Sequence, residues 1–590
     1  MRRNMKKQTF KTIIIFTISL SLTNCSEPTR DTNGLLTDNQ STVIRNYIMS
    51  QNAKNLKVNL KGQFGSNLRG LKLIGVKLID EDLSEVDLTS CEILRADFTG
   101  ANLQKAILTN AIIQESNFAN GTIQNVSGYN SDFQGSIFNN ITLQDINFVQ
   151  ANFSNTAFSK TNIKNVNFEN ARLENVLWNN DTIDGVNFQK AILKNNSLKN
   201  TNIENSIFYG ADLEGSIINS TNFTNNYFES SDLSRAKLTA VIIKDSNFTQ
   251  SIFNEINFNN VQANNSIFSY TTFQGSTLQN ISIVKCDLQS SVISGSTLAQ
   301  FKVDTSLLNN VSLNDIKFNN LSIKNSNANF ARLNKMAGVN ITFNNLSWTN
   351  NVFSNNDVKQ FTVINTDLNN SELSNSNISN SQFNNVNFSK TLMQNVNFSD
   401  VKITSGNLNQ IALIGSNLTN ITFNNSSFYN SQINNTHYTN STFVNTNFAS
   451  NIILNSEDFS KFPSNTVITS VKDLQKTTNL ANMNLANFDL SNLIFNTVNF
   501  SGAIFKNANL TNTAIQNSNI EKADFSNAIV SKTDFSNSIL TDSIFKSAKI
   551  DQANFTGSNL TNADFTEAEI KNVNFNKVTT TGVKGIDNSN

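Results

Sequence analysis

The sequence predicts an all-β solenoid, which is a stack of similar coils with little helix. Three observations support this fold class. An apolar side chain recurs at every fifth position in two tracts, residues 68–453 and 480–575, and only the centres Gly128 and Gly338 lack one. Residues twenty positions apart keep one side-chain type over long stretches. Both prolines, Pro28 and Pro463, lie outside the two tracts, as expected where stacked strands need their backbone N–H groups.

A period of five matches neither the helix nor the strand, so each pentapeptide must be a short extended segment that ends in a corner. Two residues before each central apolar residue the chain places small or β-branched types, such as Ala96 and Val166, which would point inward and fill gaps between coils. Two residues after the centre it often places glycine or asparagine, such as Gly100 and Asn110. These residue types tolerate the left-handed backbone that a corner requires.

The repeated unit has a recognisable motif, in which alanine, then aspartate or asparagine, precedes the central leucine or phenylalanine. It is plain at Ala96–Phe98, Ala211–Leu213 and Ala563–Phe565. This pattern resembles the pentapeptide-repeat family over about five-sixths of the chain. The resemblance implies a right-handed quadrilateral β-helix with four pentapeptides per coil, and therefore about 24 coils in two registers.

Side chains twenty positions apart offer an independent check on the number four, because they should stack in one column. One such column is phenylalanine throughout: Phe148, Phe168, Phe188, Phe208, Phe228, Phe248 and Phe268. The second tract has another: Phe505, Phe525, Phe545 and Phe565. Each side of the coil thus keeps its own type of central side chain, as four-sided coiling predicts.

The N-terminal segment does not follow the five-residue repeat. Basic residues precede the apolar run Thr12–Leu22, which is about half the length that a membrane span needs and is typical of a secretory signal. The run leads into Leu22-Thr23-Asn24-Cys25, which resembles the lipobox of bacterial lipoproteins. The resemblance implies cleavage before Cys25 and lipidation of its thiol. Asn24 departs from the usual small residue, and an ordinary signal peptide cut nearby is the alternative.

Lipoprotein sorting gives an expectation about the membrane. Ser26, which follows the cysteine, is compatible by analogy with the outer membrane, whereas aspartate there would suggest retention at the inner membrane. The expected location is therefore the bacterial cell envelope, with the outer membrane favoured.

These signals divide the chain into seven segments. They are a lipoprotein signal peptide (1–24), a tether (25–37), an N-terminal cap with a short helix (38–65), the first repeat tract (66–455), a break with a shift of register (456–477), the second repeat tract (478–577) and a flexible tail (578–590). In the cap, Val43, Ile44, Tyr47 and Ile48 fall on one helical face that would cover the open first coil. The break is a projecting loop, a tolerated insertion or a hinge, and we favour a loop on a nearly continuous axis.

Catalytic and metal-binding patterns are missing from the sequence. His437 is the sole histidine, so neither a usual zinc site nor a Ser-His-Asp array is expected. Cys91 and Cys286 occupy inward positions roughly ten coils apart, which is too far for a disulfide. Trp178 and Trp348 occupy centres and are interpreted as core. We therefore predict no catalytic, cofactor or metal residues, and Cys25 is the one predicted modification site.

The net charge of the chain limits which classes of partner are expected. The chain has 44 basic and 44 acidic residues, and loss of residues 1–24 would leave it only slightly acidic. This balance favours neither nucleic-acid binding nor strong mimicry of nucleic acid. Basic residues between Lys54 and Lys77 precede acidic ones between Asp80 and Glu92. We interpret these runs as a solvated face, and contact of the basic run with anionic head groups is the alternative.

Together these observations predict a non-enzymatic, lipid-anchored envelope solenoid that acts as a scaffold, an adhesin or a protein-interaction surface. Its expected partners are a membrane, through the lipid, and an unidentified protein, with no small-molecule substrate. The family resemblance implies an alternative, a DNA mimic that acts on a topoisomerase. That role needs a cytosolic protein with an acidic surface, which the export signal and the near-neutral charge disfavour. An enzyme would need its site on residues 455–479, which lack suitable side chains.

Overall fold

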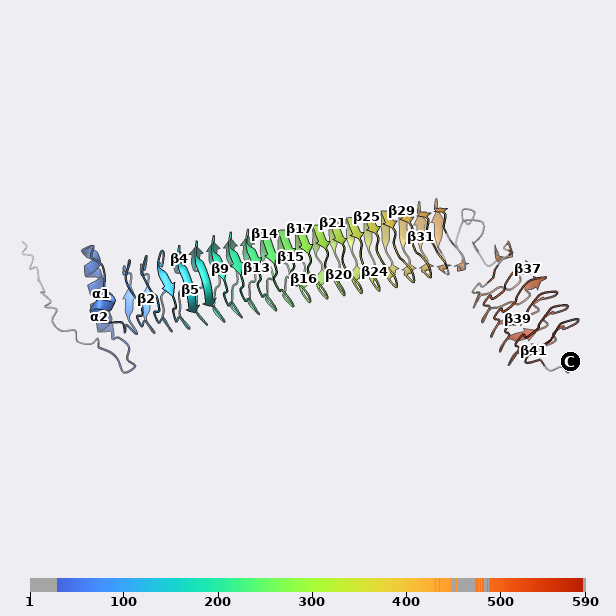
Figure 1. Cartoon of the computed structure of the whole chain (residues 1–590), viewed down its shortest axis with the longest axis horizontal. Helices are drawn as coiled ribbons and strands as arrows, with labels where there is room; N and C mark the ends of the chain where they lie inside the picture. The colour runs from blue at the N-terminus through green and yellow to red at the C-terminus, as the bar shows by residue number, and fades with distance from the viewer. Residues whose placement is uncertain are drawn as a thin grey trace, which may run out of the picture. The chain divides into compact units, whose positions relative to one another are not determined.

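The computed structural model describes residues 29–429, 431–434, 436–446, 452–454, 473–476, 478, 480–481, 485–486 and 488–586. The chain divides into two compact units, Met1–Arg172 and Leu173–Asn590, each of which is described by itself below. Both consist of parallel β-coils, and among the described residues the helices lie at the start of the first unit, apart from one 3-10 turn in the second (Figure 1). The predicted fold class, a β-solenoid, is confirmed.

The first unit begins with two helices, α1 (Asp38–Ala53) and α2 (Leu60–Phe64). Its strands are β1 (Lys72–Ile74), β2 (Glu92–Leu94), β3 (Thr122–Gln124), β4 (Ile137–Asn139), β5 (Thr142–Asn147), β6 (Ala157–Ser159) and β7 (Asn162–Asn167). Paired strands are parallel and their partners lie twenty residues apart, as in Lys72 with Glu92 and Thr122 with Thr142. Each coil therefore has four sides of five residues.

The second unit repeats this plan. Its first strands are β8 (Leu177–Asn179), β9 (Thr182–Asp184), β10 (Ser197–Lys199), β11 (Asn202–Glu204), β12 (Ile217–Asn219) and β13 (Asn222–Thr224). Two sides of the coil then join into eight-residue strands: β14 (Lys237–Lys244), β15 (Asn257–Asn264), β17 (Thr277–Val284), β19 (Thr297–Asp304), β21 (Lys317–Lys324), β23 (Ala337–Asn344), β25 (Asp357–Ile364), β27 (Asn377–Asn384) and β29 (Asn397–Thr404). They separate again in β31 (Asn417–Thr419), β32 (Thr422–Asn424), β34 (His437–Thr439) and β35 (Thr442–Val444).

A second sheet of this unit lies on another side of the coil. It contains β16 (Thr272–Gln274), β18 (Val292–Ser294), β20 (Ser312–Asn314), β22 (Arg332–Asn334), β24 (Val352–Ser354), β26 (Glu372–Ser374), β28 (Leu392–Gln394), β30 (Ala412–Ile414), β33 (Gln432–Asn434) and β36 (Ile452–Leu454). Most of the predicted break at 456–477 lies outside the described residues, apart from the 3-10 turn η1 (Asp473–Lys476). The coils after it carry β37 (Ile494–Asn496), β38 (Ala514–Gln516), β39 (Ile529–Ser531), β40 (Lys549–Asp551) and β41 (Glu569–Lys571).

The core is built from the central apolar residues, which stack in columns as predicted. In the second unit, rings from Phe188 to Phe268 at twenty-residue spacing stack with centroids 4.3–5.1 Å apart. The column from Phe505 to Phe565 repeats this at 4.5–4.7 Å. The first unit holds a further column, from Phe98 to Phe158, at 4.8–5.1 Å. Offset stacking of rings adds stabilisation beyond that of buried area.

The corners confirm the prediction of left-handed backbone and extend it. Every fifth residue from Gly70 to Asn425 has a positive φ, and so does every fifth residue from Asn492 to Gly582. Many are glycine or asparagine, but Tyr270 and Phe330 also adopt this conformation, with φ of 60° and 61°. Left-handed backbone is unfavourable for such bulky residues, so the stacked coils on either side must impose it.

Small inward residues do more than fill space. The backbone N–H of Ala96 donates to Oγ of Ser116 at 3.1 Å, and that of Ser116 donates to Oγ of Ser136 at 3.0 Å. The same arrangement joins Asn226 to Ser246 at 3.1 Å. A buried N–H group without an acceptor would be costly. Serine at this position therefore supplies an acceptor to the preceding coil, which alanine cannot do.

The cap packs helix α1 over the start of the first unit. The side chain of Thr37 caps its N-terminus by accepting from the backbone N–H of Gln40, and Ile44 and Ile48 are fully buried. Val43, which we expected on the same packing face, is 52% exposed, so the buried face is narrower than the sequence pattern indicated.

Two terminal segments are more regular than expected. Within the predicted tether, Arg30 and Leu36 form an antiparallel bridge, and the N–H of Leu36 donates to the carbonyl of Arg69 at 2.8 Å. Within the predicted tail, the described residues 578–586 continue the ladder, because Thr579 and Lys584 pair with residues of the preceding coil.

A buried carboxylate joins the cap to the solenoid. The side chain of Glu81 is 1% exposed, and its Oε1 accepts from the backbone N–H of Leu60, the first residue of α2, at 2.6 Å. Burial raises the pKa of Glu81 above its ordinary value of 4.5, although the Leu60 N–H and the charge of Lys57 oppose the shift. The carboxyl group is therefore more easily protonated in the folded chain than in the unfolded one.

Glu81→Gln should stabilise the docked cap at neutral pH. With a raised pKa, ionised Glu81 opposes folding increasingly as the pH rises through the folded-state pKa. The amide oxygen of glutamine can still accept from Leu60 without a buried charge. Hydrogen exchange of α2 should slow in the variant at pH 7, and the difference should vanish below about pH 3, where the wild-type carboxyl is neutral in both states. Glu85→Gln, at an exposed carboxylate, is the control and should change exchange at neither pH.

Candidate interaction surface

The outward positions of each coil carry whatever binding capacity the solenoid has, because the inward positions are occupied by the core. Most outward side chains are asparagine, serine or threonine, and many bond to one another. Asn417 donates to Asn397 and Asn397 donates to Asn377, both at 2.8 Å. Such ladders already use one donor and one acceptor of each amide, so a partner that bound there would compete with existing hydrogen bonds.

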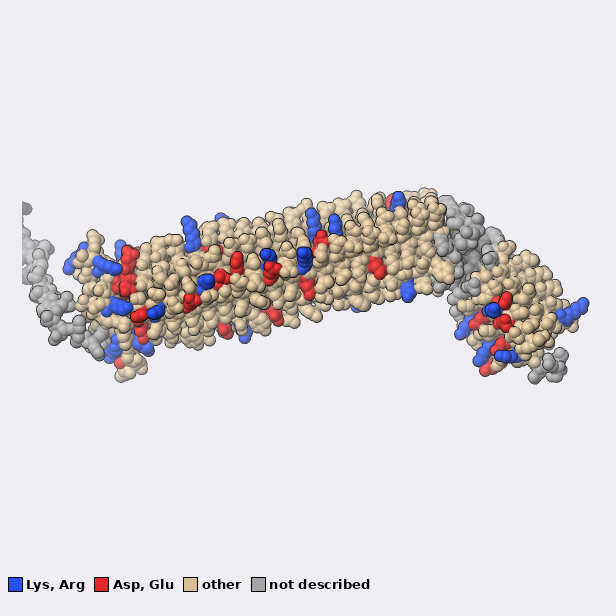
Figure 2. All heavy atoms as spheres, in the orientation of Figure 1, with Lys and Arg blue, Asp and Glu red and all other residues tan. Residues whose placement is uncertain are grey.

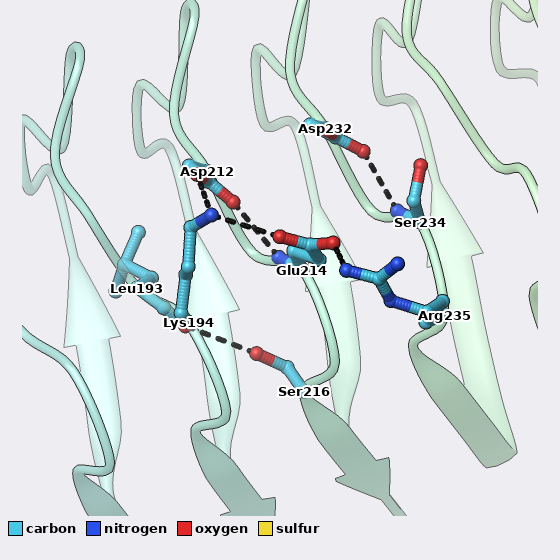
Figure 3. Close-up of polar contacts among 8 residues, drawn as sticks. All are labelled: Leu193, Lys194, Asp212, Glu214, Ser216, Asp232, Ser234 and Arg235. Atoms are coloured by element: carbon cyan, nitrogen blue, oxygen red, sulfur yellow. Dashed lines mark hydrogen bonds and ion pairs between the residues drawn. The ribbon is translucent and has the colours of Figure 1, made fainter.

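One group of charged residues interrupts this pattern, and we call it the Lys194 cluster: Lys194, Asp212, Glu214 and Arg235 (Figure 3). Nζ of Lys194 lies 3.0 Å from Oδ2 of Asp212 and 2.8 Å from Oε2 of Glu214. The guanidinium of Arg235 contacts the other carboxylate oxygen of Glu214. Glu214 thus bridges two cations that come from the coils before and after its own.

The backbone fixes the acids of the cluster. Asp212 and Glu214 flank the buried centre Leu213, so both side chains must point outward. Oδ1 of Asp212 also accepts from the backbone N–H of Glu214 at 3.1 Å. One coil further on, Asp232 makes the same contact with Ser234 at 2.8 Å (Figure 3). The carboxylate of Asp212 is therefore held by the backbone before any partner arrives, whereas that of Glu214 is held by the side chains of Lys194 and Arg235.

The cluster is suited to recognition more than to stability. The side chains of Arg235 and Lys194 are 60% and 36% exposed, and ion pairs this open contribute little to folding. Tyr209 and Tyr227 on the same coils are 42% and 51% exposed. Arginine and tyrosine are enriched among residues that dominate binding energy at protein interfaces. This surface therefore offers charges of both signs, and exposed tyrosines lie on the same coils.

The structure places the residues singled out in the sequence as follows. The predicted lipidation site, Cys25, lies outside the described residues. Cys91 and Cys286 are free and buried, and burial raises the pKa of both thiols, that of Cys286 to about 11. Neither thiol is therefore a reactive thiolate at neutral pH. His437 lies outward on β34, and Trp178 and Trp348 are each 2% exposed in the core.

Sites for small ligands are scarce in the part of the chain that the structure describes. Within it no three His, Cys, Asp or Glu side chains gather to hold a metal ion. Apolar cavities of about 20 Å³ lie beside Ala263 and Ala328, where a short central side chain leaves space. Cavities of this size hold at most a water molecule. Among the described helices, none has the length and apolarity to cross a membrane.

Sequence reasoning missed the Lys194 cluster. Its ion pairs join residues 18, 20 and 21 positions apart, so they form only because the coil repeats every twenty residues. A search for opposite charges at offsets of 18 or 20 would have found Lys194 with Asp212 and Glu214.

Comparisons with known proteins agree with this architecture. A profile described as pentapeptide repeat region matches residues 131–208. A second, described as pentapeptide repeats in eight copies, matches ten overlapping segments that fall within 66–127, 206–280, 364–420 and 478–579, which together make up half of the chain. A search of curated proteins finds no significant match.

Several solved structures resemble the chain. HetL, a pentapeptide repeat protein involved in heterocyst differentiation regulation from the cyanobacterium Nostoc, is 15% identical, covers 40% of this chain and 94% of its own, and has a TM-score of 0.22. QnrB1, a plasmid-mediated fluoroquinolone resistance protein, is 21% identical, with coverages of 29% and 77% and a TM-score of 0.16. Rfr23 from the cyanobacterium Cyanothece is 18% identical, with coverages of 20% and 86% and a TM-score of 0.13. At such values, neither the function nor the partners of these proteins carry over.

Proposed function

Because this chain belongs to the pentapeptide repeat family, we propose that it is a non-enzymatic interaction protein, anchored by lipid at Cys25 to the bacterial cell envelope, with the outer membrane favoured. The observation that carries the anchor is Leu22-Thr23-Asn24-Cys25 directly after a basic and apolar leader. The interaction role is supported by the Lys194 cluster and by exposed Tyr209 and Tyr227 on the same coils, which have no part in the core.

The anchor is tested by labelling cells with a radioactive fatty acid and separating their membranes. Wild-type protein should carry the label and sediment with the envelope, and Cys25→Ala should lose the label. Cys91→Ala is the matched control, because that thiol is buried and should leave labelling unchanged. A Cys25→Ala protein that is processed as before, or a wild-type protein that remains unlabelled in the cytosol, would refute the anchor.

The interaction role is tested by crosslinking in intact cells. We expect a discrete crosslinked species that is lost when Lys194→Glu and Arg235→Glu break the cluster. The pair Lys359→Glu and Lys390→Glu makes the same change of charge at exposed positions elsewhere in the second unit and should keep the species. Equal loss in both variants would show that net charge, and not this surface, governs the contact.

The alternative, a DNA mimic, requires a long continuous acidic surface. On the face shown in Figure 2, acidic side chains instead lie in short groups, among basic residues and a large uncharged majority. The Lys194 cluster is itself of mixed sign. These observations favour a partner that does not recognise a uniformly acidic surface.

A further inference from the structure

The outer surface of the N-terminal cap combines exposed apolar residues with unpaired basic ones. Val43, Met49 and Leu56 are 52%, 53% and 55% exposed, and Ile79 on the first coils is 42% exposed. An open cleft of about 590 Å³ runs between the end of α1 and these coils, with Met49, Leu56 and Ile79 in its lining. Large apolar side chains this exposed and this close together indicate a surface that is covered by something.

The charges of the cap surface are mainly basic. Arg45, Lys54 and Lys57 are exposed, and none of them has a salt bridge among the residues that the structure describes. Two of the acids close by are engaged, since Asp38 pairs with Lys72 at 2.8 Å and Glu81 is buried against α2. Asp80, at the edge of the cleft, and Asp82 are the exceptions, since both are exposed and neither has a salt bridge among the described residues. In Figure 2, basic side chains gather at the helical end of the first unit, and acidic ones lie over the coils that follow.

The chain itself limits how far this surface can be from a lipid attached at Cys25. The first described residue, Thr29, lies 3.1 Å, between Oγ1 atoms, from Thr37, which caps α1. Thr29 lies four positions after Cys25, and a fully extended chain spans about 14 Å over that distance. A lipid at Cys25 would therefore keep the start of α1 near the head groups, and Met49 and Leu56 lie toward the other end of this helix, which spans about 24 Å and can lie along the bilayer.

From these three observations we infer that the N-terminal cap docks on an anionic lipid bilayer, with Met49 and Leu56 entering the head-group region and Arg45, Lys54 and Lys57 contacting lipid phosphates. This inference deepens the proposed function, on which it rests for the nearness of a membrane. Apolar insertion and basic charge together are the combination that holds peripheral helices at membranes. The contact would also set the direction in which the coils of the first unit leave the bilayer.

The test uses the mature chain, residues 25–590, carrying Cys25→Ser, so that binding cannot come from the lipid. Vesicles of phosphatidylcholine with phosphatidylglycerol are compared with vesicles of phosphatidylcholine alone by co-sedimentation. We expect binding to the anionic vesicles only, with affinity falling as salt is added. Lys54→Glu with Lys57→Glu should weaken binding about tenfold or more, since each basic residue near the surface contributes roughly 1 kcal/mol. Met49→Asp with Leu56→Asp should also weaken it.

The matched control is Lys302→Glu with Lys402→Glu, which changes the net charge equally at exposed positions on β19 and β29 and should bind like the parent. The inference is overturned if the parent ignores anionic vesicles, or if the control loses as much affinity as the cap variant. Neither result bears on lipidation, because this protein lacks Cys25. Failure of the docking surface and failure of the anchor are therefore separate outcomes.

Discussion

Phe228→Ala should destabilise the second unit by about 3–5 kcal/mol. The ring is fully buried and stacks between Phe208 and Phe248, with centroids 4.3 and 4.5 Å away. Its removal leaves a cavity in the column and takes a packing partner from two neighbours at once. Because long repeat arrays lose two-state behaviour, hydrogen exchange of the flanking coils is the most direct measurement, with urea denaturation in support.

The matched control is Phe330→Ala, which deletes the same atoms from a corner side chain that is 56% exposed. It should change stability by no more than about 0.5 kcal/mol. Similar losses in the two variants would contradict the view that the stacked phenylalanines carry the stability of the coils.

The second large effect is expected at the cap. Ile48→Asp places a carboxylate where the side chain is 0% exposed, and an unpaired buried charge costs several kcal/mol. Helix α1 should therefore leave the first coil, and the uncovered backbone edge should associate with other chains. Light scattering should report larger species, and limited proteolysis should cut α1 more quickly than in the parent protein.

Val43→Asp serves as the control for this variant, because Val43 lies on the same helix but is 52% exposed. It should stay monodisperse and resist the protease like the parent. A monodisperse Ile48→Asp protein would show that the first coil needs no cover.

Much of the fold could be predicted from the sequence because the apolar side chains that define the period also make up the core. The five-residue spacing located the centres, and the twenty-residue columns gave the number of sides. The exception at the centre Gly128 also has a structural reason. A Cβ atom there would lie 2.5 Å from the ring of Phe148, so only glycine fits. The column therefore loses no packing at that level.

Other features depended on contacts that no local pattern encodes. The left-handed backbone at Tyr270 and Phe330 is imposed by neighbouring coils, against the preference of those residues. The docking of Leu36 on Arg69 and the bond from Leu60 to Glu81 join segments that share no periodicity. The Lys194 cluster was hidden for a similar reason, because outward positions are free of the repeat and show no pattern until the coils are stacked.

Because each coil contains twenty residues, the length of this protein can change without disrupting its columns only in steps of twenty residues. Loss or duplication of a whole coil, such as residues 287–306, returns every later side chain to its own side, so the columns and the outward faces survive. Loss of one pentapeptide moves each later residue by a quarter of a coil and brings unrelated columns together. During evolution such a protein can therefore gain or lose whole coils, and its variants of different length can keep the same binding face aligned.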